Sequence, residues 1–373
     1  VVPRVRVDDD GLAEGAQDTF EERQLHRPIF TLEEGWLLGR FGSLDVKLGK
    51  QIFAWGTGDI LNPTDVVNPV DYSDLIDSEK IGVPAADAAL YIGESSRVRL
   101  VLVPTYTPSR LPPEGHRFSP LPPGGVFFPA PTPSGVIGPV PVADRDFPAR
   151  TPEDAQIALR GSTTVQVLDR GFDLSATYWY GWNRLPVLTI DPRADPFVPV
   201  ELTPRYDRIH MIGADVSTTV SDFEVHAEGA QFLTEGERDD DYLQYVVGSH
   251  YTRGDILAAK DELRLILEYA GEWVTHHAKD EDVITASSFS RAFESAVLGR
   301  VAYKPIEHLE LQTTVAFLVK KPTSAFIQPQ ASYELGSHTK IKAGFDILEG
   351  NDDSFFGQYD KEDRFWMSLK LSF

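Results

Sequence analysis

The side chains of this sequence that could do chemistry are charged groups placed at every second position of long extended segments. Within 263–274, Arg264, Glu268 and Glu272 share one parity, whereas the residues of the other parity are almost all apolar. Because side chains alternate between the two faces of a β-strand, this spacing puts charges on one face and apolar groups on the other. Fixed charges on a wet face can bind or repel passing ions, so we expect them to line a water-filled passage.

Both signs of charge occur on the predicted wet face. Strong ion selectivity would need a ring of one sign. Because acids and bases nearly balance, we predict at most a weak cation preference, set by the acidic loops. The candidate pore-lining residues are Asp45, Lys47, Arg99, Arg160, Asp173, Glu228, Arg264, Glu268, Glu272, Arg300, Glu310, Lys340 and Lys342.

Catalytic chemistry is poorly supported by the sequence. His226 and His250 have the polar parity, but Ser249 has the apolar parity and should face away from them. A serine hydrolase needs a nucleophile, a base and an acid within reach of one another, and the Gly-Xaa-Ser-Xaa-Gly pattern does not occur. We therefore expect a protein that is not an enzyme and that carries no cofactor.

Composition excludes further classes of function. The net charge of −22 and the pI of about 4.8 leave no basic face for nucleic acid. The chain has no cysteine, so it has no disulfide and no thiolate metal site. No apolar run approaches the roughly 20 residues that a membrane-spanning helix needs.

The alternating segments are about nine to eleven residues long, the length that a tilted strand needs to cross a bilayer. A soluble β-sandwich would also alternate, but two features favour a transmembrane barrel. Charges recur on the polar face, and tight turns such as Gly42-Ser43 alternate with long connections. The alternation of 365–373, which ends on Phe373, also resembles the last strand of bacterial outer-membrane barrels. We therefore expect the protein in the outer membrane.

We predict an all-β fold in one domain over residues 1–373: a transmembrane antiparallel β-barrel with short periplasmic turns and long extracellular loops. Fifteen alternating segments follow residue 31, and the last of them must end on the periplasmic side. A further strand within Val1–Asp8 must then bring the chain to the outside, which gives sixteen strands. Fourteen or eighteen strands stay as alternatives, because bacterial single-chain barrels have even strand numbers.

A barrel of sixteen strands is too wide to be filled by the side chains of its own wall. We therefore expect a loop to narrow the passage. The connection 106–153 holds 13 of the 27 prolines and carries Phe118, Phe127 and Phe128, the candidate constriction residues. Such a long apolar loop favours an ordered segment in the mouth. A mobile outer loop and a docking surface are the alternatives. The connection 55–86 is the second candidate for a constricting loop.

Most of the net charge falls in the predicted outer connections. Asp239-Asp240-Asp241 and Asp352-Asp353 could hold divalent cations through carboxylate oxygens, or bridge through such ions to lipopolysaccharide. Simple solvated loops are the alternative, because the spaced motif of a calcium-binding loop is absent.

One stretch carries a recognisable motif. Gly49-Lys50-Gln51, Trp55-Gly56, Asn62-Pro63-Thr64-Asp65 and Asn68-Pro69-Val70-Asp71 follow one another within 44–112. This pattern resembles a large family of Gram-negative outer-membrane barrels of unknown function. The resemblance implies a porin-like architecture and no catalytic residues. The motif also fits a structural role, in which its turns seat a loop in the barrel.

The function that we expect is an outer-membrane channel for passive diffusion of small solutes, narrowed by its long loops. Its partners would be outer-membrane lipid, lipopolysaccharide and the solutes, and it could form a homo-oligomer. Two alternatives stay open. One is a structural barrel that sheaths a partner such as a lipoprotein, a secreted polymer or an electron carrier. The other is a channel for hydrophobic molecules.

Overall fold

The computed structural model describes residues 2–5, 14–15, 23–24, 26–113, 116–119, 126–128, 138–149, 151–192, 200–236, 238–278, 283–284, 293–336 and 338–371. Within these ranges the fold is all-β, apart from two short 3-10 turns, η1 (Pro152–Asp154) and η2 (Gly357–Tyr359). The described residues include no helix of the length and apolar character that a membrane crossing requires.

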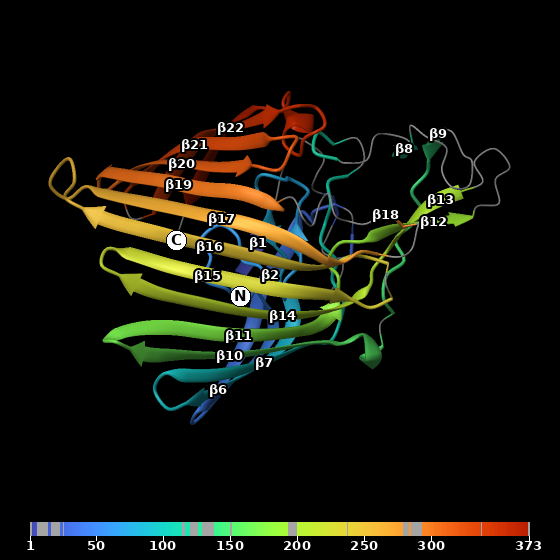
Figure 1. Ribbon diagram of the computed structural model, residues 1–373, viewed down its shortest axis with the longest axis horizontal. Helices are drawn as coiled ribbons and strands as arrows, with labels where there is room; N and C mark the ends of the chain where they lie inside the picture. Colours follow the sequence, from blue (N-terminus) through green and yellow to red (C-terminus); the bar gives the residue numbers. More distant parts are fainter. Residues whose placement is uncertain are drawn as a thin grey trace.

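One antiparallel sheet of 16 strands makes up most of the structure (Figure 1). Each strand pairs with the next large strand along the chain, and β1 and β23 lie at the two edges. The expected sixteen strands are therefore present. In sheet order they are β1 (Val2–Val5), β2 (Phe30–Phe41), β3 (Leu44–Gln51), β6 (Val83–Ile92), β7 (Ser96–Val103), β10 (Gln156–Val167), β11 (Arg170–Trp182), β14 (Arg208–Val220), β15 (Phe223–Thr234), β16 (Asp241–Gly254), β17 (Glu262–His276), β19 (Ser295–Ile306), β20 (Leu309–Leu318), β21 (Ser324–Leu335), β22 (Thr339–Gly350) and β23 (Arg364–Leu371).

Seven shorter strands lie in the connections and were not apparent from the alternation. A run of two to six residues is too short to establish a period of two, and proline interrupts it. Figure 1 shows β12, β13 and β18 beyond the end of the large sheet. These short strands are β4 (Val70–Asp71), β5 (Glu79–Lys80), β8 (Val126–Phe128), β9 (Gly138–Val140), β12 (Val187–Pro192), β13 (Val200–Arg205) and β18 (Val283–Ile284).

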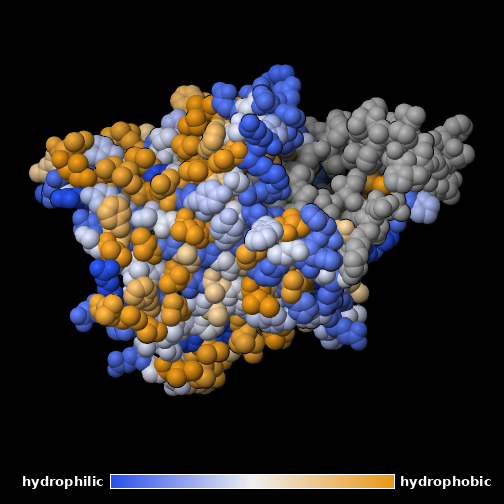
Figure 2. All heavy atoms as spheres, viewed as in Figure 1, coloured by the Kyte–Doolittle hydropathy of each residue, from blue (hydrophilic) through white to orange (hydrophobic). Residues whose placement is uncertain are grey.

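The two faces of the large sheet differ in chemistry. On β17, Leu267 and Trp273 are 62% and 70% exposed, whereas Glu268 and Ala270, which have the opposite parity, are buried. Hydrophobic side chains are spread over the wall of strands in Figure 2, and hydrophilic ones gather where the wall meets the connections. The apolar parity therefore faces outward, and the polar parity faces the interior.

The sheet curls so that both of its edges approach one short piece of chain. Arg4 of β1 forms ion pairs with Glu33 and Glu79. Arg364 of β23 forms an ion pair with Asp74. Asp74 and Glu79 are only five residues apart, so the sheet must wrap around the segment that holds them. Among the described residues, β1 is paired only with β2 and β23 only with β22.

The core lies between the inner face of the sheet and residues 52–82, which connect β3 to β6. We call these residues the inner segment. Its Phe53, Trp55 and Val67 are buried in one cluster with wall residues that include Trp179 and Met211. The inner segment therefore packs against the curled wall rather than extending away from it.

Candidate functional site

The start and the end of the inner segment are tied together by one asparagine. Asn68 Oδ1 accepts a hydrogen bond from the N–H of Phe53 at 2.7 Å. Asn68 Nδ2 donates to the carbonyl oxygens of Gln51, at 3.0 Å, and Ile81, at 2.8 Å. Gln51 in turn donates from Nε2 to the carbonyl of Ala85 at 2.9 Å. These residues of the sequence motif satisfy buried backbone groups that would otherwise have no partner.

A second part of the motif seats the inner segment through buried charge. Asp71 is 1% exposed and forms ion pairs with Arg110, which is 2% exposed, and with Arg27. Ser73 donates its N–H to Asp71 at 3.0 Å. Burial tends to raise the pKa of Asp71, but Arg110 and Arg27 outweigh it and hold this pKa below its ordinary value of 3.8. Asp71 therefore joins the inner segment to the connection that follows β7.

Glu228 of β15 binds the main chain at the tip of the inner segment, residues 57–64. Its carboxylate accepts N–H hydrogen bonds from Thr57 at 2.9 Å, Gly58 at 3.5 Å and Thr64 at 2.6 Å. Glu228 is only 3% exposed. Hydrogen bonds to a charged acceptor are stronger than neutral ones, so these contacts offset part of the cost of burying the carboxylate.

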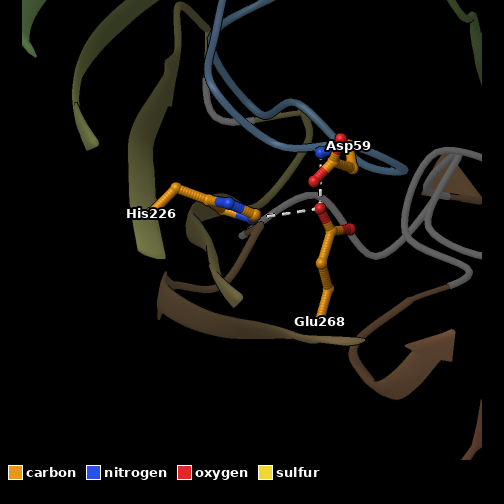
Figure 3. Close-up of side chains that lie close together, drawn as sticks. All are labelled: Asp59, His226 and Glu268. Atoms are coloured by element: carbon orange, nitrogen blue, oxygen red, sulfur yellow. Dashed lines mark hydrogen bonds and ion pairs between the residues drawn. The ribbon is translucent and has the colours of Figure 1, made fainter. Parts of the chain in front are cut away.

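Glu268 of β17 binds the same tip in a similar way (Figure 3). It accepts N–H hydrogen bonds from Asp59 at 2.5 Å, Ile60 at 3.2 Å and Leu61 at 3.3 Å. Consecutive backbone N–H groups that converge in this manner form an anion-binding concavity. The tip is therefore held from two separate strands by wall carboxylates.

His226 of β15 reaches Glu268 across an intervening strand. The register places His226 opposite Gly248 of β16, and Gly248 opposite Glu268. A Cβ at position 248 would lie 2.5 Å from His226 Nε2, so the glycine leaves room for the imidazole. His226 Nε2 lies 3.1 Å from Glu268 Oε1, and the Asp59 carboxylate completes a group of three (Figure 3).

A buried arginine, Arg184, fixes the other side of the inner segment. Arg184, which follows β11, donates to the carbonyls of Val66, Val67 and Thr107. Its guanidinium lies 4.9 Å from the centroid of the Trp179 ring. Burial lowers the pKa of Arg184 to about 10, so the side chain stays charged at neutral pH.

The predicted lining residues share the inner face of the sheet, but part of the set is covered. Arg160, Glu228 and Glu268 are buried, because the inner segment and its ion partners lie over them. The residues that are partly or fully exposed are Asp45, Lys47, Arg99, Asp173, Arg264, Glu272, Arg300, Glu310, Lys340 and Lys342. Parity identifies the face of a side chain and does not show what packs on that face.

The structure pairs several of these side chains with charged neighbours. Arg160 lies 2.8 Å from Asp215, and Arg99 lies 2.6 Å from Asp87. Further pairs are Arg264 with Glu262 at 2.9 Å, Glu310 with Lys304 at 3.5 Å, and Lys340 with Glu334 at 3.2 Å. Several of the predicted lining charges are therefore neutralised by local ion pairs.

The predicted constriction residues are only partly described. Phe118 is fully buried, and its ring lies 5.5 Å from that of Tyr359. Phe127 and Phe128 belong to β8, and their side chains lie outside the described residues. Within the described part of the chain, the backbone N–H groups that Glu228 and Glu268 hold belong to residues 57–64. These residues lie in the second candidate loop, 55–86.

The two acidic clusters differ in their exposure. Asp239 and Asp240 are buried, and Asp240 accepts the N–H of Ala278 at 2.8 Å, whereas Asp352 and Asp353 are exposed. Among the described residues, the one group that could hold a metal ion is Asp59, His226 and Glu268. Sequence reasoning placed His226 and Glu268 on one face but missed this group, because Asp59 enters it only when the loop folds inward.

An engineered disulfide should join the inner segment to the wall. Thr64 Cγ2 lies 2.6 Å from the position that a Cβ on Gly213 of β14 would take, so two cysteine side chains at these positions would be adjacent, as a disulfide requires. We expect Thr64→Cys with Gly213→Cys to oxidise in the folded protein and to shift its migration in non-reducing gels. Because the natural chain has no cysteine, Thr64→Cys with Glu94→Cys, at a short turn, serves as the unlinked control. A pair that stays reduced would show that the tip lies elsewhere.

A known protein family matches nearly the whole chain. The family described as "Protein of unknown function (DUF1302)" matches residues 4–371, from β1 to the end of β23. The curated proteins include no match to this chain. The chain therefore belongs to the DUF1302 family of proteins of unknown function.

Proposed function

We propose that the large sheet closes into a barrel in the outer membrane of a Gram-negative bacterium and forms a channel for passive diffusion of small solutes. The observation that carries this proposal is the position of the inner segment. It contacts wall strands from both edges of the sheet and from its middle, so a solute that passes through the barrel must pass this segment.

The outward face supports a membrane location. Met367 and Leu369 on β23 are 71% and 62% exposed, and Leu267 on β17 is 62% exposed. An apolar surface that continues over neighbouring strands is unfavourable in water and favourable against acyl chains. Closure is supported because β1 and β23 both reach the inner segment, and an unpaired edge strand in lipid would leave backbone groups without hydrogen bonds.

The extent to which other residues cover the inner face of the sheet supports a narrow passage rather than a wide pore. Near the long connections, the inner face is covered by the inner segment and by the cluster that contains Phe118 and Tyr359. Toward the short turns, Arg264, Glu310 and Lys342 stay partly exposed. Solutes would therefore be sorted at the inner segment, and a polar vestibule would follow it.

Recordings in planar bilayers test this function. The purified intact chain should give small single-channel conductance steps with a weak cation preference, because its net charge is −22. A reversal potential that shows anion preference would contradict the selectivity. A folded barrel that never conducts and that co-purifies with a second chain would instead support the sheath for a partner.

A groove on the outer face favours hydrophobic molecules as a second candidate substrate class. It has a volume of about 550 Å³, and its lining includes Thr313, Pro329, Ala331, Ala343 and Phe345. Hydrogen-bonded pairing of β21 with β22 is interrupted at the proline, which weakens the wall there. Mass spectrometry after delipidation tests this candidate. It would be favoured if the protein conducts no ions in bilayers and retains a bound acyl compound.

A further inference from the structure

Three potential metal ligands meet where the tip of the inner segment touches the wall. In Figure 3, His226 and Glu268 extend toward each other from β15 and β17, and Asp59 approaches from the inner segment. One ligand atom from each residue lies within 4.8 Å of the other two. The imidazole and the Glu268 carboxylate are almost fully buried, so they are shielded from competing water.

The distances suit a small divalent transition metal ion. His226 Nε2 and Glu268 Oε1 are 3.1 Å apart, and two ligands of one tetrahedral zinc ion with bonds of about 2.0 Å are separated by about 3.3 Å. The N–H groups of Asp59 and Ile60 donate to Glu268 Oε1. Ligand carboxylates are commonly oriented by such secondary hydrogen bonds.

A second histidine and a third carboxylate lie next to this group. His250 Nδ1 is 3.9 Å from an Asp59 carboxylate oxygen and 3.6 Å from one of Glu224. His250 Nε2 lies 2.9 Å from the hydroxyl of Thr252. When Nε2 donates to that hydroxyl, Nδ1 presents its lone pair toward two carboxylates, an arrangement that a cation between them would stabilise.

We propose that Asp59, His226 and Glu268 bind a divalent transition metal ion of the zinc type, with His250 and Glu224 beside the open coordination position. Imidazole and carboxylate together are ligands that such ions accept. His226 and Glu268 belong to the wall, whereas Asp59 belongs to the inner segment. The ion would therefore pin the tip to the wall, and it would hold the channel in its narrow state. That last consequence rests on the proposed function, whereas the binding site does not.

Zinc titration of the tag-free protein in detergent, followed by isothermal calorimetry, tests the site. We expect one Zn²⁺ per chain, and about tenfold or greater weakening in both Asp59→Asn and His226→Gln. Asp59→Asn keeps the backbone N–H that Glu268 accepts, and His226→Gln keeps a side-chain N–H donor. His277→Gln, in an outer connection, is the matched control and should bind like the natural chain.

The same variants separate failure of the site from failure of the channel. Absence of zinc binding in the natural chain, or unchanged affinity in both site variants, would overturn the proposed site.

In bilayers, Zn²⁺ should lower the conductance of the natural chain and have a smaller effect on Asp59→Asn. Zinc binding with no change of conductance would overturn the pinning. If the natural chain never conducts, the channel proposal fails, and calorimetry still decides the site. Circular dichroism confirms that each variant is folded.

Discussion

Replacing residues 53–81 with a short turn should raise the single-channel conductance by about tenfold or more, because a barrel of sixteen strands without a constriction leaves an aqueous channel. The replacement is geometrically simple. Gln51 and Val83 are register partners on β3 and β6, so a tight hairpin turn can join the two strands beyond them. The wall strands themselves stay unchanged.

The measurement is planar-bilayer recording of the shortened and intact proteins at the same salt concentration. Replacing residues 193–199, which connect β12 to β13, with a short turn is the matched control, and we expect it to conduct like the intact chain. A milder variant, Glu228→Ala with Glu268→Ala, removes the two anchors and should give frequent transitions to larger conductance. Equal conductance in the shortened and intact proteins would show that the inner segment does not limit the passage.

Among the single substitutions, Asp71→Asn has the largest expected effect on stability. This change removes a carboxylate that is shared by two arginines and leaves Arg110 buried without it. Removing one partner of a buried ion pair costs about 3–5 kcal/mol. We expect that loss in the free energy of unfolding, measured by urea titration of the protein in lipid. Asp173→Asn, at an exposed position of β11, should change this free energy by no more than about 0.5 kcal/mol.

The pH dependence of this difference identifies its cause. Arg110 and Arg27 hold the pKa of Asp71 below 3.8 in the folded protein, against the opposing effect of burial. The ion pairs therefore contribute their full stability above pH 3.8, and this contribution disappears as the pH falls through the folded pKa. The gap between the natural chain and Asp71→Asn should shrink below pH 3.8. A gap that stays constant through this range would indicate a packing defect rather than the loss of a charge.

The wall of strands could be predicted from the sequence because alternation is a local property. Each strand shows its two faces within a few residues, and the exposed Leu267 beside the buried Glu268 is the pattern that the sequence contains. Even the short first strand, β1, could be predicted. The last strand was expected to end on the periplasmic side, so a further strand had to bring the chain to the outside before β2. No single long-range contact was needed for this part of the fold.

The position of the loops could not be predicted in the same way. The prolines and apolar residues of 106–153 made it the first candidate for the constriction, yet the tip held by Glu228 and Glu268 belongs to the second candidate loop. These contacts join residues more than 160 positions apart. A sequence pattern shows that such glutamates face inward, but it does not show which backbone N–H groups they will meet.

The attachment of the tip has a consequence for how members of this family can diverge. Glu228 and Glu268 hold main-chain amides, and every residue except proline supplies one. The anchorage itself therefore does not depend on which side chains the tip carries, although Ile60 and Leu61 also pack against the buried cluster that contains Phe118 and Tyr359. Under the proposed channel function, the same two anchors can hold tips of different sequence, and a designed library could vary the tip residues while Glu228 and Glu268 stay in place.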